Sequence, residues 1–146
     1  MTEPRFEPRI TLITLGVANL ARARAFYEDG LGWKASPASQ GDVVFFQAGA
    51  LAFALYPRRL LAEDAGVPAG GQGFSGIMLA RNVREPADVK HLLAIADAAG
   101  GRITRPAQDA FWGGRTGYFA DPDGHIWKVA WNPHFGLAED GALRLP

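Results

Sequence analysis

A single lysine interrupts the last apolar strand that the sequence predicts, and it is the residue best placed to do chemistry. Residues 126–131 alternate with period two, so Lys128 lies on the same face as Ala130 and Asn132. An ammonium group left unpaired in an apolar cavity is costly, and neighbouring positions on this face offer no acid. We expect either a hydrated cavity or a ligand whose carboxylate or enolate pairs with Lys128. Alternatively, the lysine stem follows the wall of the cavity and its amine reaches solvent.

A second candidate is the loop that precedes this closing hairpin. Phe111 and Trp112 are followed by Gly113 and Gly114. A glycine-hinged loop with two aromatic side chains can close over a ligand and stack on a flat group. The same loop can instead be anchored on the protein by its own aromatic side chains. The sequence leaves both interpretations open.

Other polar side chains can supply contacts to a ligand in a mostly apolar cavity. They are Gln47, Tyr56, Arg115, Tyr118 and Asn132. No catalytic residue can be assigned among them.

The acidic and histidine side chains near the hairpin have structural explanations. Asp121 and Asp123 resemble a carboxylate pair, but a tight Asp-Pro-Asp-Gly turn accounts for both. His125 lies beside this turn, His91 falls on the polar side of a predicted helix, and His134 follows the last strand. Of the three, His134 is the one that could cap a cavity.

Composition restricts the classes of partner. The chain has 146 residues, 15 basic and 15 acidic side chains, and no cysteine. A zero net charge gives no electrostatic basis for binding nucleic acid or an anionic membrane. The absence of cysteine excludes disulfides and thiolate ligands and suits a reducing cytoplasm, where we expect the protein to reside. No segment has the length and apolarity of a membrane span, and the polar first residues do not resemble a secretory signal.

Hydrophobic periodicity predicts the same order of elements twice. The first unit consists of a strand at 10–17, a helix that Asn19 caps, a strand beginning at Trp33, and a hairpin of 42–47 with 51–56. A short helical turn and a Gly-rich connector occupy residues 58–72. The second unit consists of a strand at 74–80, a helix through Val89 and Ala96, a strand at 102–104 and the closing hairpin. The repeat implies two βαβββ modules that complete one structure.

The run LITLGVANLARARAFYEDGLGW resembles the opening module of the vicinal oxygen chelate superfamily, which includes glyoxalase I, bleomycin-resistance proteins and extradiol dioxygenases. The run DPDGHIWKVAWNP resembles the closing strand of the same superfamily, and FWGGRTGYFADPDGHIW is similar in particular to its uncharacterised glyoxalase-like bacterial branch. The resemblance implies a single α+β domain over 1–146, with module one at about 8–57, connector 58–72 and module two at about 73–134. Its strands are expected to form an eight-stranded, open, cup-shaped barrel around a binding cavity.

The resemblance also implies where metal ligands would lie. Members of the superfamily hold a divalent metal with His, Glu or Gln on four strands, and the metal polarises substrate oxygens. The matching positions here are Leu12, Ala54, Gly76 (or Phe74 or Met78, one pair away) and Lys128. None of these side chains is a standard ligand, and a lysine ammonium repels a cation. We therefore expect no metal and no other cofactor.

Two functions follow from this resemblance. The first is a metal-free protein that binds a small organic molecule in the cup, as the bleomycin-resistance relatives do. The second is a lyase or dioxygenase-type enzyme with a non-standard site, in which a Lys, Tyr or Arg side chain does the work. In either case we expect a homodimer, and the sequence does not identify the ligand.

Overall fold

A computed structural model describes residues 5–146 and begins with a strand, a helix and a π-helical turn. Strand β1 (Leu12–Val17) buries alternate side chains, as its periodicity predicts. The Asn19 side chain then accepts a hydrogen bond from Arg22 N at 3.0 Å and caps helix α1 (Leu20–Ala25). The helix continues as π-helix η1 (Phe26–Gly30), which places both Phe26 and Tyr27 in the core.

The first sheet has three strands. β2 (Val44–Ala48) and β3 (Leu51–Pro57) form the predicted hairpin, and β1 joins it parallel to β3 in the order β1-β3-β2. The strand expected from Trp33 is wrong, because this segment makes only an isolated bridge between Ala35 and Phe46. Trp33 N donates to Tyr27 O at 2.9 Å, and the indole ring packs within the aromatic core. These contacts hold the segment against the helix end instead of along a strand.

A helix and a loop separate the two modules. α2 (Arg58–Ala65) ends at Gly66, whose φ of 73° is the left-handed conformation typical of a helix C-terminus. The helical turn and connector expected over 58–72 are therefore present. The next strand, β4 (Met78–Asn82), begins later than the predicted 74–80, since Gly76 has a φ of 87° that breaks an extended strand.

The second sheet has four strands in the order β4-β7-β6-β5 and completes a βαβββ unit. Helix α3 (Pro86–Ala98) follows β4, and its first turn carries a capping box between Glu85 and Asp88. Strand β5 (Arg102–Asp109) is longer than the predicted 102–104. Pro106 is tolerated there because β5 is an edge strand. β6 (Arg115–Ala120) and β7 (Ile126–Trp131) form the predicted closing hairpin.

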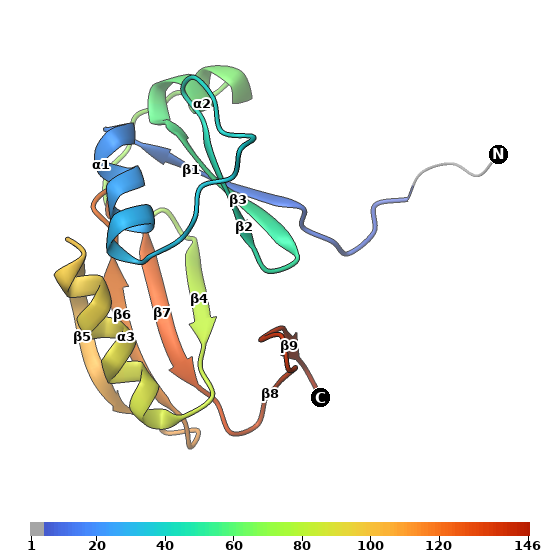
Figure 1. Cartoon of the computed structure of the whole chain (residues 1–146), viewed down its shortest axis with the longest axis vertical. Helices are drawn as coiled ribbons and strands as arrows, with labels where there is room; N and C mark the ends of the chain where they lie inside the picture. Colours follow the sequence, from blue (N-terminus) through green and yellow to red (C-terminus); the bar gives the residue numbers. More distant parts are fainter. Residues whose placement is uncertain (1–4) are drawn as a thin grey trace.

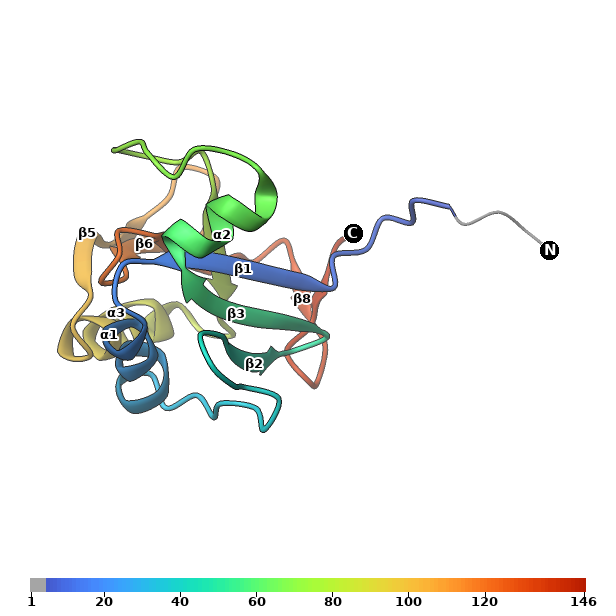
Figure 2. The same cartoon turned by 90° about the horizontal axis from the view of Figure 1, so that it is seen from above.

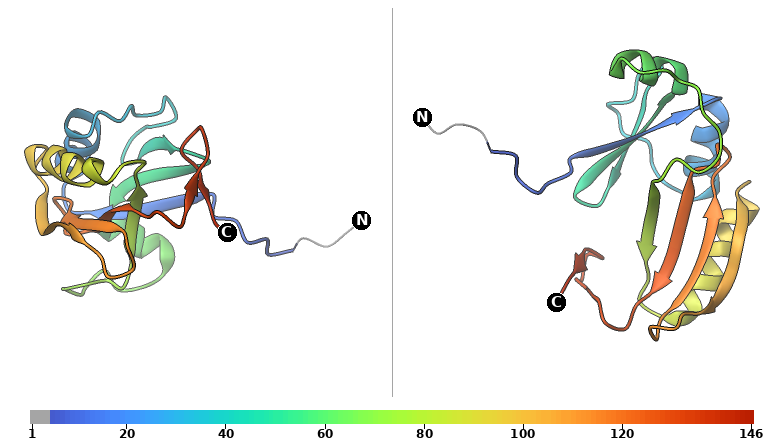
Figure 3. Two further views of the ribbon diagram at one scale, coloured as in Figure 1. Left: turned by 90° about the horizontal axis from the view of Figure 1, so that it is seen from below. Right: turned by 180° about the vertical axis from the view of Figure 1, so that it is seen from behind.

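Helix α1 and η1 cover one face of the three-stranded sheet, α3 covers one face of the four-stranded sheet, and α3 packs against η1 (Figures 1 and 2). Helix α2 lies on the other side of the three-stranded sheet from α1 (Figure 2). The core lies between these covered faces and is strongly aromatic. Its largest cluster consists of Phe26, Tyr27, Trp33, Phe46, Phe53, Phe119 and Trp127. The four-stranded sheet, seen from behind, has α3 on its far side only (Figure 3). The chain is thus a mixed α+β fold with two sheets.

A buried polar network, formed by Tyr27, Asp121 and Trp127, joins the two modules. Asp121 Oδ2 accepts a hydrogen bond from the Tyr27 hydroxyl at 2.8 Å, and Trp127 Nε1 donates to the same hydroxyl at 3.1 Å. Asp121 Oδ1 accepts from two backbone NH groups of its own turn, as the turn interpretation requires. Burial, and then the negative charge of Asp121, raise the pKa of the Tyr27 hydroxyl far above its ordinary value.

The rest of the closing turn is also bonded to module one. Asp123 Oδ1 accepts from Ala18 N at 2.8 Å and pairs with Arg22 at 3.1 Å. His125 Nε2 lies 2.8 Å from the carbonyl oxygen of Gly16, to which it donates. The turn residues therefore have structural roles, as expected, and they also hold the modules together.

The C-terminal segment forms a small hairpin that the sequence interpretation did not include. β8 (Gly136–Leu137) pairs with β9 (Leu143–Arg144), and Arg84 donates to the carbonyl oxygens of Ala138 and Glu139 at 2.7 and 3.0 Å. Within residues 5–146, no helix has the length and apolarity needed to cross a membrane.

Candidate functional site

The side of the four-stranded sheet that points away from α3, here called the pocket face, carries the polar side chains of the site. Gly117 and Val129 pair across β6 and β7 on the covered side, where Gly117 lies against Leu93 of α3. The next pair, Tyr118 and Lys128, therefore points to the pocket face. The predicted orientation of Lys128 and its grouping with Tyr118 thus follow from the strand register.

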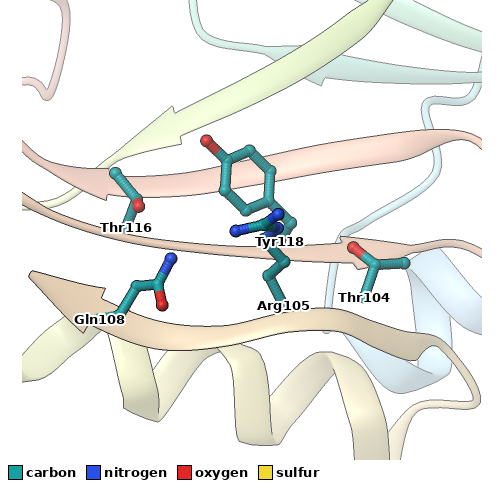
Figure 4. Close-up of a pocket in the computed structure, with 5 residues that line it drawn as sticks. All are labelled: Thr104, Arg105, Gln108, Thr116 and Tyr118. Carbon is teal, nitrogen blue, oxygen red and sulfur yellow. The ribbon is translucent and has the colours of Figure 1, made fainter. Parts of the chain in front are cut away.

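Edge strand β5 adds polar residues that the sequence interpretation missed. Arg105 pairs with Tyr118 and Gln108 pairs with Thr116, so both lie on the pocket face. Together with Thr104 they line a shallow cavity of about 350 Å³. Figure 4 shows the guanidinium of Arg105 beside the Tyr118 ring and the phenol oxygen pointing away from β5. Pro106 obscured this strand in the sequence, and the two register shifts in β5 break the alternation that would have revealed its faces.

Lys128 is half-buried and lies on a strand with neighbours on both sides. Its Nζ is 5.7 Å from the centre of the Trp112 ring, which is within the range of a cation–π interaction. Among residues 5–146, the ion pairs that form do not include Lys128. The ammonium group is therefore positioned by an aromatic ring and not by a carboxylate.

The aromatic–glycine loop is held by contacts at both ends. Trp112 packs so closely on Gly114 that a side chain at Gly114 would overlap the indole ring. The Trp112 carbonyl accepts from His134 Nε2 at 3.1 Å, and Ala110 N donates to Gly114 O at 2.8 Å. Phe111 is fully exposed at the tip. These contacts favour the anchored loop of the two interpretations, with Trp112 as a fixed wall beside Lys128.

Two of the predicted ligand residues have other partners. Arg115 lies on the same side of β6 as Gly117, away from the pocket face, and pairs with Asp109 at 2.8 Å. Asn132 directly follows β7, and its side-chain oxygen accepts from His134 N at 2.8 Å. The structure therefore separates Arg115 from Tyr118, although the two are close in sequence, because alternate residues of a strand point to opposite faces.

Tyr56 and Gln47 lie on the other, three-stranded sheet. Gln47 Nε2 donates to the carbonyl oxygens of Gly49 and Leu51 at 2.8 and 3.3 Å and so closes its own hairpin. Tyr56 is half-buried near the end of β3. Partial burial and the negative charge of Asp64 raise the pKa of its hydroxyl. Within the described chain, strands of the two sheets are not hydrogen-bonded to each other.

The residues present do not fit the metal that the resemblance implies. Leu12 begins β1, Ala54 is buried in β3, Met78 begins β4 and Gly76 precedes it. In residues 5–146, no three His, Asp or Glu side chains are grouped closely enough to hold an ion.

Comparison with known proteins assigns the family. The model of the glyoxalase/bleomycin resistance protein/dioxygenase superfamily matches residues 9–129. A glyoxalase-related enzyme from Fulvimarina pelagi is similar in structure, with 36% identity, a TM-score of 0.86, and coverage of 95% of this chain and 99% of that one.

Two structures with lower sequence identity have a similar fold. A glyoxalase/bleomycin resistance protein/dioxygenase from Nocardioides has 28% identity and a TM-score of 0.72, with 89% of this chain and 85% of that one covered. A lactoylglutathione lyase from Agrobacterium tumefaciens has 21% identity and a TM-score of 0.66, with 88% and 96% covered, and shows the fold alone. A search of curated proteins finds no match. The chain belongs to the glyoxalase/bleomycin resistance protein/dioxygenase superfamily.

Proposed function

We propose that this protein binds a small organic molecule on its pocket face without the divalent metal typical of the superfamily. The observation that carries the proposal is the group formed by Lys128, Tyr118 and Trp112, since Lys128 occupies the position at which the resemblance implies the last metal ligand. These side chains can bind an organic ligand by hydrogen bonds, charge and stacking. The lysine ammonium repels a cation and replaces the oxygen or nitrogen donor that a metal needs.

We further propose that the three-stranded sheet of a second copy of the chain completes a cup around the ligand, with one strand fewer than expected because the segment at Trp33 forms no strand. In a single copy of the chain the cavity on the pocket face is shallow. The first residues of edge strands β1 and β4 are apolar and exposed, with exposed fractions of 46% for Leu12 and 44% for Met78. Covering such edges stabilises a dimer in proportion to the apolar area removed from water. A partner sheet would also supply the second wall that a drug-sized ligand needs, and Tyr56 and Gln47 lie on a sheet suited to that role. We place this homodimer in the cytoplasm, which the lack of cysteine suits.

A second candidate function is an enzyme of the superfamily with a non-standard site. The direct pairing of Lys128 and Tyr118 supports it, because an amine and a phenol are both able to transfer protons. The Fulvimarina relative is called an enzyme, and it is 36% identical to this chain. A lyase or dioxygenase-type reaction would then use these groups in place of the metal.

Elemental analysis of the purified protein and a thermal-shift screen test the proposal together. We expect less than stoichiometric transition metal, and stabilisation by organic ligands, since a ligand that binds only the folded state raises the unfolding temperature. Light scattering should give the mass of two chains. One tightly bound transition metal per chain, or a screen in which no small molecule stabilises the protein, would contradict the proposal. Turnover of a stabilising ligand would favour the enzyme.

A further inference from the structure

Three side chains form a row across the pocket face on three adjacent strands. Arg105 of β5 pairs with Tyr118 of β6, which pairs in turn with Lys128 of β7. Strands in a sheet are about 4.8 Å apart, so the backbones of the two cations are separated by roughly 10 Å with the phenol between them. Both cationic side chains are long enough to reach a common group above Tyr118.

The row carries two positive charges that the protein leaves without acidic partners. In the described part of the chain, the ion pairs formed by arginine and lysine do not include Arg105 or Lys128. The nearest acid on β5, Asp109, lies on the other side of the strand and pairs with Arg115. The neighbouring side chains on the pocket face, Gln108 and Thr116, are neutral. An anion is therefore the ligand that these charges attract.

We propose that the site takes a small organic acid whose carboxylate or phosphate group is held between Arg105 and Lys128, with Tyr118 donating a third hydrogen bond. This inference rests on the proposed function, because it names the class of ligand for the same face. Arg105 supplies a planar guanidinium that can bind two oxygens of one acidic group. Trp112 positions the ammonium of Lys128 through the contact of 5.7 Å.

The adjacent residues define the remainder of the ligand. Gln108 and Thr116 offer an amide and a hydroxyl on the next row, which suits a neutral hydroxyl or carbonyl close to the acidic group. The cavity that Arg105 and Tyr118 line has a volume of about 350 Å³, and Lys128 lies one strand beyond its lining. This volume is near the lower end of ligand pockets and fits a compact molecule. A short hydroxy acid, an aromatic acid or a phosphate ester has this chemistry.

Calorimetric or NMR titration with matched pairs of probes tests the inference. Benzoate is compared with benzamide, glycolate with glycolamide, and inorganic phosphate serves as the simplest anion. We expect each acid to bind at least about tenfold more tightly than its amide, as the loss of a charged hydrogen bond implies. Arg105→Gln and Lys128→Met should each weaken the acids by about tenfold or more while leaving thermal stability unchanged or, for Lys128→Met, raised.

Lys90→Gln is the matched control. It removes the same charge from the exposed side of α3, on the opposite side of the sheet, and should leave binding unchanged. If amides bind as well as acids, or if Arg105→Gln binds acids normally, the inference is wrong while small-molecule binding stands. If neither class binds at millimolar concentration, the inference and the proposed function fail together.

Discussion

Replacing Tyr27 by phenylalanine tests whether the buried polar network holds the two modules together. The substitution keeps the ring in the aromatic core and removes only the hydroxyl. It leaves Asp121 Oδ2 without its 2.8 Å donor and Trp127 Nε1 without its 3.1 Å acceptor. A hydrogen bond to a charged group contributes about 1.5–3 kcal/mol and a neutral one about 0.5–1.5 kcal/mol. We therefore expect Tyr27→Phe to lower the free energy of unfolding by about 2–4 kcal/mol.

Thermal and urea denaturation measure this change. For a domain of this size the loss corresponds to a fall of roughly 10 °C in the unfolding temperature. Tyr118→Phe is the control, because its hydroxyl lies on the pocket face and its removal should change stability by less than about 0.5 kcal/mol. A loss below about 1 kcal/mol for Tyr27→Phe would mean that the network contributes no more than an ordinary surface bond.

The pH dependence of stability gives a second measurement of the same group. The pKa of the Tyr27 hydroxyl is raised in the folded protein, whereas an unfolded tyrosine releases its proton near pH 10. Above that pH the unfolded state binds fewer protons than the folded state, so the contribution of Tyr27 is present below about pH 10 and is lost as the pH rises further. The difference in stability between wild type and Tyr27→Phe should therefore shrink above about pH 10. A difference that stays constant to higher pH would contradict the assigned environment.

Two further predictions concern the aromatic–glycine loop. Gly114→Ala should destabilise the protein by about 1–3 kcal/mol in thermal denaturation, because the added methyl overlaps the Trp112 ring and lies 2.5 Å from the carbonyl oxygen of Trp131. At Gly113 an added methyl makes only an ordinary contact of 3.8 Å with His134 Nε2, but φ is 98°, so Gly113→Ala measures backbone strain without overlap. Trp112→Ala should weaken ligand binding by about 1–3 kcal/mol and abolish the ligand-induced change in tryptophan emission. A Trp112→Ala protein that loses stability but binds normally would show that this side chain only anchors the loop.

Local patterns in the sequence were sufficient for most of the elements. The capping of α1 by Asn19, the hairpin of β2 and β3, and the Asp-Pro-Asp-Gly turn depend on interactions within a few residues. Period-two alternation also predicted correctly that Lys128 and Trp127 point to opposite sides of β7. These features follow from backbone geometry and neighbouring side chains, which a sequence contains directly.

Where the sequence interpretation failed, contacts between elements of the folded chain decided the outcome. Trp33 did not open a strand, since its ring packs on Tyr27 and Phe46 in the aromatic core. Strand β5 continued past Pro106 because only one of its edges has a partner. Each of these results depends on which segments lie side by side in the folded chain.

Tertiary structure also decided which residues belong to the candidate site. The sequence suggested Lys128, Tyr118 and Trp112 among its candidate ligand residues, and strand register and packing bring these three together. It could not identify Arg105, whose position opposite Tyr118 depends on two register shifts in β5. Sequence alone therefore determined the family, most of the elements and the unusual lysine. Only the pairing of neighbouring strands decided which polar side chains share a face, because register is set by contacts between strands and not within them.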